Sequence, residues 1–234
     1  MKTLSRRFAC AALLAAMVGP AVAQNQPIPV IDGPTYVMTY VEVVPSGAGA
    51  ALAALKEYRD AARREPGAMF VDIMQEDGRP YNFVLSEVWQ NRGTASTHAS
   101  AAAMKAMNDK VKPIALGPTD LRVHQAHSAA PPKAPSPNSV VVISHCDVAG
   151  GNTQNLINAF APLTEASRKD SGMVRFDVLD EVPLHANHFR VYEEWANMAA
   201  FDAHNRAPHT QTYRQVILQW LGTPYDQRLY KVVS

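Results

Sequence analysis

Residues 83–89, FVLSEVW, recur at residues 189–195 as FRVYEEW. In each stretch a Glu stands two residues before a Trp, and a His follows nine residues after it. These residues are Glu87, Trp89 and His98 in the first stretch, and Glu193, Trp195 and His204 in the second. Upstream, Gly67 and Asp72 match Gly172 and Asp177, and the offset is 105 residues at the glycines and 106 at the tryptophans. Five matched positions in one order indicate a duplicated unit.

Each copy has the pattern of strand, helix, two strands, helix and strand. Runs of β-branched and aromatic residues predict strands over 36–44, 68–75, 81–89 and 120–127 in the first copy, with helices over 50–64 and 93–111. In the second copy we expect strands over 140–148, 173–181, 187–195 and 229–232, and helices over 152–169 and from Asn197. Pro208 should break or kink the last helix, because proline lacks the amide hydrogen that the helix needs.

This order predicts an α+β fold made of two ferredoxin-like βαββαβ modules. In such a module both helices cover one face of a four-stranded sheet, so the other face is bare. An uncovered apolar face must be buried or it becomes an association surface. We therefore expect the two modules to pack sheet to sheet within one chain, as a pseudo-dimer.

The start and the middle of the chain differ in composition from the two modules. Residues 1–23 have the positive start, short apolar run and Ala21-Val22-Ala23 cleavage site of a signal peptide, which predicts a periplasmic or secreted protein. The Arg6-Arg7 pair leaves Sec and twin-arginine export both open. Residues 24–34 form a proline-rich arm, and residues 128–138, with four prolines in SAAPPKAPSPN, form a semi-rigid linker. The modules then span residues 35–127 and 139–234.

Composition excludes several classes of protein. The formal net charge is +1 and no block of like charge occurs, which argues against a nucleic-acid-binding protein. After the signal peptide, no stretch is apolar enough to span a membrane. Cys10 leaves with the signal peptide, so Cys146 is the one cysteine of the mature chain and an internal disulfide is excluded.

The motifs resemble those of the antibiotic biosynthesis monooxygenase family: E-P-G, then F-x-x-x-E-x-W, then a histidine on the second helix. Arg64-Glu65-Pro66-Gly67, Phe83–Trp89 and His98 match this line, whereas the second copy has Lys169-Asp170-Ser171 where the E-P part would stand. The resemblance implies a dimeric α+β barrel, here fused in one chain. It also implies oxidation of a quinol or phenolic aromatic by molecular oxygen without any cofactor, in a pocket between the sheet and helices of a module.

Candidate site residues follow from this chemistry, which needs a group that takes the phenolic proton. Histidine suits proton transfer near neutral pH, so His98 and His204 are the candidate catalytic residues. Candidate substrate-binding residues are aromatic, charged or hydrogen-bonding neighbours of these histidines. They are Trp89, Trp195, Glu87, Glu193, Phe201, Arg206, His209 and Tyr213. Most of the last group lies in the second copy, which favours that module as the one with a pocket.

Several alternatives stay open at this point. On a strand, Glu87 and Trp89 point to the same face. A structural role is therefore an alternative, in which Trp89 is a core residue and the buried Glu87 has a histidine as its partner. The non-catalytic alternative is a periplasmic binding or stress protein with the same fold. The paired histidines give no three-ligand set for zinc, so no metal is expected. Asn108 and Arg214 stand where the haem-degrading branch of the superfamily has its haem ligand, so haem is not expected either, and Met104 and Met107 read as core residues. The sequence leaves open whether the fused pseudo-dimer forms a further homo-oligomer.

Overall fold

The computed structural model describes residues 31–182 and 187–233, so the expected signal peptide and most of the arm lie outside the described residues. The first module contains the strands β1 (Thr35–Glu42), β2 (Ala68–Glu76), β3 (Asn82–Trp89) and β4 (Asp120–Ser128). Its helices are α1 (Ala48–Ala62), α2 (Arg92–Ala99) and α3 (Ala102–Val111), with two short 3₁₀ turns, η1 (Pro45–Gly47) and η2 (Lys112–Ile114).

The second module repeats this order. Its strands are β5 (Val140–Asp147), β6 (Met173–Glu181), β7 (His188–Trp195) and β8 (Asp226–Val233), and its helices are α4 (Thr153–Ser167), α5 (Met198–Arg206) and α6 (Pro208–Ile217). The last strand thus begins at Asp226, three residues before the predicted start at Leu229.

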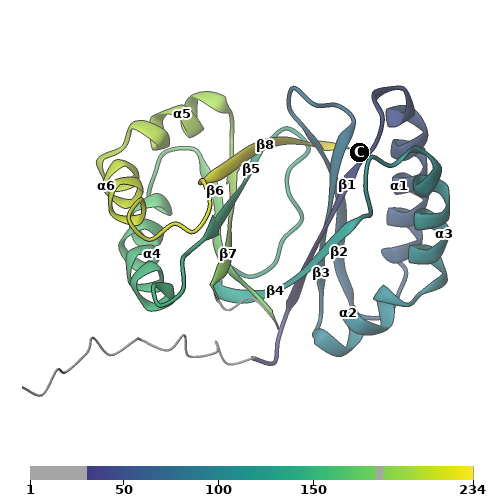
Figure 1. The fold of residues 1–234 in the computed structure, drawn as a ribbon, viewed down its shortest axis with the longest axis horizontal. Coiled ribbons are helices and arrows are strands. Elements are labelled where there is room, and N and C mark those ends of the chain that lie inside the picture. The colour runs from purple at the N-terminus through teal and green to yellow at the C-terminus, as the bar shows by residue number, and fades with distance from the viewer. Residues whose placement is uncertain (1–30, 183–186, 234) are drawn as a thin grey trace, which may run out of the picture.

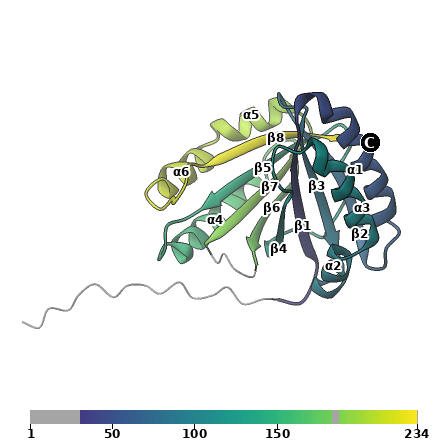
Figure 2. The same cartoon turned by 45° about the vertical axis from the view of Figure 1, so that its right-hand side comes forward.

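The eight strands form one closed antiparallel barrel in the order β1-β3-β2-β8-β5-β7-β6-β4. Each module supplies four adjacent strands, and the modules join edge to edge at β2–β8 and β4–β6. The helices of each module lie outside its own sheet, on opposite sides of the barrel (Figures 1 and 2). The predicted pseudo-dimer is confirmed, and its closure pairs both edges of each module's sheet.

Apolar side chains fill three layers. One cluster lies inside the barrel, between the two sheets, and includes Met38, Met74, Ile143 and Leu179. The others lie between each sheet and its own helices. Strand β3 is buried along its whole length, because alternate residues face its helices and the barrel interior.

The predicted helix over residues 93–111 is wrong as one continuous element. The chain leaves the helix after Ala99, Ala101 is extended (φ −70°, ψ 156°), and α3 begins at Ala102. The second module has the same break at Ala207 (φ −65°, ψ 142°), and Pro208 occupies the first turn of α6. There Pro208 predicts the break correctly, whereas no proline marks it in the first module.

The linker is held against the second module by hydrogen bonds. The Ala130 amide donates to Asp177 (3.0 Å) and the Ser136 amide donates to Glu194 (2.7 Å). Arg175 donates to the Lys133 carbonyl oxygen (2.9 Å). Within the described ranges, no helix is long and apolar enough to cross a membrane.

Candidate functional site

The Glu–Trp–His set of the first module meets between β3 and α2. Glu87 and Trp89 point to the same face of β3, and the indole nitrogen donates to Glu87 Oε2 at 2.9 Å. His98, in the last turn of α2, stacks on Trp89 with ring centroids 4.1 Å apart. Its Nε2 atom lies 3.5 Å from Glu87 Oε2. The expected strand-to-helix Glu–His contact is therefore present.

Tyr58 of α1 completes this cluster, which sequence reasoning missed. Its hydroxyl group donates to Glu87 Oε1 at 2.5 Å and also lies 2.5 Å from His98 Nε2. The other ring nitrogen of His98 lies 2.7 Å from Glu65 Oε2. Burial raises the pKa of the Glu87 carboxyl, and burial with the nearby Glu87 charge raises the pKa of Tyr58 well above its usual value. The phenol therefore keeps its proton.

The second module has the same set with one difference. Trp195 donates to Glu193 Oε2 at 2.9 Å, and His204 Nε2 lies 3.8 Å from the same oxygen. The position that matches Tyr58 is Leu163, and among the residues that the structure describes no phenol bridges Glu193 and His204. Burial raises the pKa of Glu193 to about 7, against smaller lowering effects of Trp195 and a nearby arginine, Arg214. This carboxyl thus changes its charge near neutral pH.

Polar and aromatic groups of α6 and of the segment before β8 lie close enough to Glu193 to interact with its charge. Tyr213 and Tyr225 interact with its charge, and burial is the main cause that raises their own pKa values. Arg214 is half-buried, and its Nε atom has no hydrogen-bond partner among the described residues. A buried donor without a partner is unusual in a folded protein. The matched residue of the first module is Asn108, so this positive charge belongs to the second module alone.

The remaining predicted residues are divided between the core and the surface. Phe201 is buried beside Trp195, with ring centroids 6.3 Å apart. His209 is half-buried and contacts Asp170 at 3.0 Å. Tyr213 is buried, and its hydroxyl lies 3.4 Å from Cys146 Sγ. Arg206 is exposed at the end of α5, so the structure does not bring it into the buried cluster.

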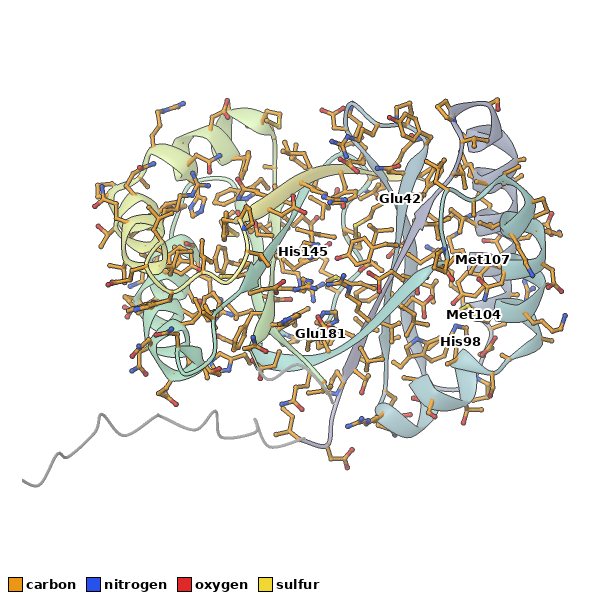
Figure 3. All side chains as sticks on the ribbon, viewed as in Figure 1. Glu42, His98, Met104, Met107, His145 and Glu181 are labelled. Carbon is orange, nitrogen blue, oxygen red and sulfur yellow. The ribbon has the colours of Figure 1, made fainter. Side chains whose placement is uncertain are left out.

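Both histidines are almost closed from solvent. His98 is 2 % exposed and His204 is 3 % exposed. His98 lies between the sheet of the first module and its helices, near the helix α3 that carries Met104 and Met107 (Figure 3). Met104 and Met107 are core residues of this layer, as expected.

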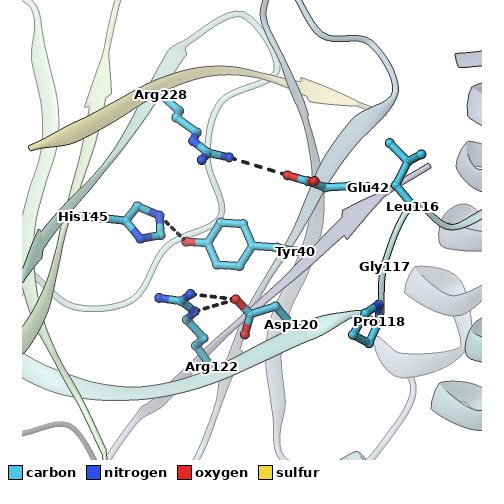
Figure 4. Close-up of a pocket in the computed structure, with 9 residues that line it drawn as sticks. All are labelled: Tyr40, Glu42, Leu116, Gly117, Pro118, Asp120, Arg122, His145 and Arg228. Carbon is cyan, nitrogen blue, oxygen red and sulfur yellow. Dashed lines mark hydrogen bonds and ion pairs between the residues drawn. The ribbon is translucent and has the colours of Figure 1, made fainter. Parts of the chain in front are cut away.

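A second, polar location lies where β1, β4, β5 and β8 meet (Figure 4). It is a cavity of about 290 Å³ whose lining includes Tyr40, Arg122, His145 and Arg228. Tyr40 and His145 stand at matched positions of the two copies, and the Tyr40 hydroxyl lies 3.1 Å from His145 Nε2. Burial and the Arg122 charge lower the pKa of His145 to about 4, so this imidazole is neutral at pH 7.

Residues that sequence reasoning missed had left some signal. Glu65 and Asp170 are acids two residues before the matched glycines, and each binds the histidine of its module. The repeated D-x-R at 120–122 and 226–228 marks the polar cavity. Tyr58 had no such signal, because its ring fits the apolar face of the predicted helix over 50–64. The partners of its hydroxyl group come from other elements of the fold.

Comparison with solved structures shows the same fold at low identity. A protein from Fusobacterium nucleatum described as a candidate monooxygenase has a TM-score of 0.74 at 14% identity, over 88% of this chain and 94% of that chain. An anthrone oxidase-like protein has 0.71 at 14%, over 88% and 95%. A candidate monooxygenase from Lactobacillus acidophilus has 0.67 at 15%, over 86% and 94%. Among curated proteins no match was found.

The sequence itself identifies the family. The profile of antibiotic biosynthesis monooxygenases matches the chain twice, over residues 34–110 and 139–216. These ranges hold both Glu–Trp–His sets and most of both modules. The chain therefore belongs to the antibiotic biosynthesis monooxygenase family, as a tandem duplication fused into one barrel.

Proposed function

We propose that the protein is an exported, cofactor-independent monooxygenase that oxidises a quinol or another phenolic aromatic with molecular oxygen. The observation that supports this proposal is the position of Tyr58. Its phenol group lies between a buried Glu and a buried His, 2.5 Å from each. The first module thus carries, in its own chain, a phenol bound to the Glu–His pair.

In the second module we place a substrate phenol at the corresponding position. Leu163 replaces Tyr58 there, so Glu193 and His204 have no phenol of the chain between them. Arg214, absent from the first module, supplies a positive charge close to Glu193. A cation next to a phenol favours the phenolate, because the charged form is stabilised by the opposite charge. Trp195, Phe201 and Tyr213 would form the aromatic wall.

The proposed reaction balances without an added reductant. His204 takes the phenolic proton, and the resulting anion gives one electron to oxygen. The two radicals combine at a ring carbon that carries hydrogen, which forms a peroxide. Loss of that carbon-bound hydrogen as a proton, together with cleavage of the O–O bond, gives a carbonyl and water. One oxygen atom enters the product, the other becomes water, and the substrate supplies all the electrons.

Oxygen uptake by the mature chain on a panel of quinols and phenols tests this proposal. We expect uptake with at least one quinol, and loss of uptake in His204→Ala with an unchanged circular dichroism spectrum. Leu163→Tyr should also abolish uptake, because it recreates the phenol of the first module at the substrate position. Leu163→Met, which conserves volume, should keep it. Full activity of Leu163→Tyr and His204→Ala, or no uptake with any quinol, would contradict the proposal.

A non-catalytic binding or stress protein is the second candidate, and one observation favours it. The side chains of both Glu–His pairs are closed from solvent. Closed pairs with satisfied hydrogen bonds are what a structural role requires. Tight binding of an aromatic compound, measured by quenching of tryptophan fluorescence, would support this candidate if no oxygen is taken up.

Export is part of the proposal and has its own test. The twin-arginine pair and the cleavage site lie within residues 1–23. We expect the protein to be found in the periplasm or medium with Gln24 as its first residue. Replacement of both arginines by lysine should block export by the twin-arginine route and leave Sec export intact.

A further inference from the structure

Three side chains from three different segments of the second module form one cluster, and one of them lies far from the other two in sequence. They come from Asp170, after α4, from His204, in the last turn of α5, and from His209, in the first turn of α6. Asp170 Oδ2 lies 2.8 Å from His204 Nδ1 and 3.0 Å from His209 Nε2. One ligand atom from each residue fits within 4.8 Å of the other two. We infer that Asp170, His204 and His209 form a binding site for a divalent transition metal of the zinc type.

The broken helix creates this cluster. On a continuous helix, residues five apart in sequence point about 140° away from each other. The extended residue Ala207 interrupts the helix, and Pro208 starts α6 in a new direction. The imidazole centroids of His204 and His209 are consequently only 5.4 Å apart. A spacing of five residues therefore does not reveal the histidine pair. The acid is not evident from the sequence either, because it lies 34 residues before His204.

The donor set and the exposure fit a zinc-type ion. Two imidazole nitrogens and a carboxylate oxygen are the three protein ligands of many zinc sites that keep a fourth position for water. Asp170 and His209 have side chains 23% and 21% exposed, so an ion can reach them from solvent, whereas His204 is 3% exposed. Tetrahedral ligands at zinc lie about 3.3 Å apart. The two contacts of Asp170 with the imidazoles need to lengthen by only a few tenths of an ångström to reach that spacing, and the two imidazole nitrogens lie within 4.8 Å of each other.

The surroundings of His204 support the same assignment. A metal-binding imidazole commonly donates its other N–H to a carboxylate, which fixes its orientation. The Nε2 atom of His204 faces Glu193 Oε2 at 3.8 Å, while Nδ1 faces the proposed metal. The Thr210 hydroxyl lies 3.2 Å from the ring nitrogens. The positive charge of Arg214 lies close enough to affect His204 and opposes metal binding to a smaller degree.

The first module provides a matched comparison inside the same chain. Glu65 and His98 make the same acid–imidazole contact at 2.7 Å. The position that matches His209 is Ala103, which is half-buried at the start of α3. This module therefore has two of the three ligands and should not hold the metal.

Metal binding does not depend on the proposed oxidation, but it would affect it. A metal on Nδ1 leaves the proton of the neutral imidazole on Nε2, so a metal-bound His204 cannot accept a phenolic proton. The site would thus switch off His204 as a base. The test below measures binding alone, so its failure is distinguishable from failure of the proposed function.

The experiment is calorimetric titration of the untagged mature chain with Zn²⁺ at pH 7.5, after treatment with a chelator and its removal. We expect one Zn²⁺ per chain with a Kd of about 1 µM or lower. Co²⁺ should give the visible absorption bands of a tetrahedral site. His209→Ala and Asp170→Asn should each weaken binding by about 100-fold or more. His209 is half-buried, so its replacement should leave the fold intact.

Two variants of the first module serve as controls. Glu65→Gln, the counterpart of Asp170→Asn, should bind Zn²⁺ as tightly as the unchanged chain. Ala103→His should add a second equivalent of Zn²⁺, because it supplies the missing third ligand. Absence of Zn²⁺ binding in the micromolar range, or undiminished binding in both His209→Ala and Asp170→Asn, would overturn the assignment.

Discussion

At the scale of single residues, both copies keep the same Glu–Trp–His set but differ in the groups that contact it. Both modules keep a Trp that donates to a buried Glu at 2.9 Å, and a His beside that Glu. One difference is Tyr58 in the first copy against Leu163 in the second. A hydroxyl group that satisfies two buried partners stabilises a core, whereas its absence leaves those partners for other uses. The first pair therefore has the character of a structural element, and we propose a site only at the second.

Removal of the Tyr58 hydroxyl tests the structural role of the first pair. Tyr58→Phe leaves Glu87 and His98 each without one buried partner, so we expect a loss of about 1–3 kcal/mol in the free energy of unfolding. Urea denaturation followed by circular dichroism measures this loss. Tyr40→Phe is the control, because that hydroxyl lies at a polar cavity and should cost less. An equal, small loss in both variants would contradict the structural role.

The raised pKa of Glu193 predicts that stability depends on pH. Its folded-state pKa of about 7 lies above the ordinary value of 4.5, so the folded protein holds a proton that the unfolded chain releases. The stabilisation is complete below pH 4.5 and is lost as pH rises through 7. Glu193→Gln keeps an acceptor for Trp195 but carries no charge. Between pH 5 and 8 the free energy of unfolding of the variant should rise by about 2.5 kcal/mol relative to that of the unchanged protein.

Denaturation at several pH values measures that difference. Glu165→Gln is the control, because Glu165 is exposed and forms an ion pair with the neighbouring Lys169 on the surface of α4, and its effect on the pH dependence should be small. A difference between Glu193→Gln and the unchanged chain that does not vary with pH would show that Glu193 is ionised throughout.

The sequence predicted the pairing of these residues but not their full surroundings. Period-two geometry places Glu87 and Trp89 on one face, and the repeat identifies their counterparts. The partners Tyr58 and Arg214 come from other elements, and which atoms they reach depends on how the helices pack. For Arg206 the composition of the helix suggested a role in the site, yet its position on α5 leaves it exposed.

At the scale of elements, the turn before β2 and the helix after β3 depend on each other. Gly67 and Gly172 have φ values of 85° and 80°, and each strand that follows has a bulge within its first residues. A Cβ atom at Gly67 would lie 2.5 Å from the Thr94 side chain, which closes the capping box of α2. The matched glycines that revealed the repeat are therefore needed for both backbone conformation and space.

Two alanine substitutions separate these causes. Gly78 also has a positive φ, of 79°, but a Cβ atom there meets nothing within 4 Å. Gly78→Ala should cost only the backbone strain, about 1–2 kcal/mol. Gly67→Ala should cost a further 1–3 kcal/mol or so, from the clash with Thr94. Thermal melts of both variants measure these losses of stability. Equal losses would show that α2 can move away from the added Cβ atom without a measurable loss of stability.

The break between the paired helices shows where prediction from the sequence fails. In the second module Pro208 predicts the break, because proline is favoured in the first turn of a helix and disfavoured in its interior. In the first module only small residues surround Ala101, and tertiary packing selects its extended conformation over the helix that its propensity favours. The zinc-type site depends on this break, which explains why the sequence concealed it.

At the scale of the whole molecule, the closed barrel makes each module depend on the other. The sequence predicted that two bare sheet faces must cover each other. The structure adds that the edge strands of the two modules also pair with each other, at β2–β8 and β4–β6. The identity of the edge partners could not be predicted, because the pairing register depends on closure of the ring and not on either module alone.

Separation of the modules tests this dependence. Residues 24–131 expressed alone would expose the inner sheet face and two strand edges, so we expect a self-associated dimer or aggregate. Mixing during refolding with residues 132–234 should give a one-to-one complex. Size-exclusion chromatography with light scattering measures both. A soluble, folded monomer of residues 24–131 would show that each module is independent.

The most direct test of the functional account follows the oxygen atoms. The chelator-treated mature chain is given ¹⁸O₂ and a quinol that supports oxygen uptake, and the product is analysed by mass spectrometry. We predict one ¹⁸O atom per product molecule, one O₂ consumed per product and no accumulation of hydrogen peroxide. Product that contains no ¹⁸O, with hydrogen peroxide formed in equal amount, would contradict monooxygenation by this chain.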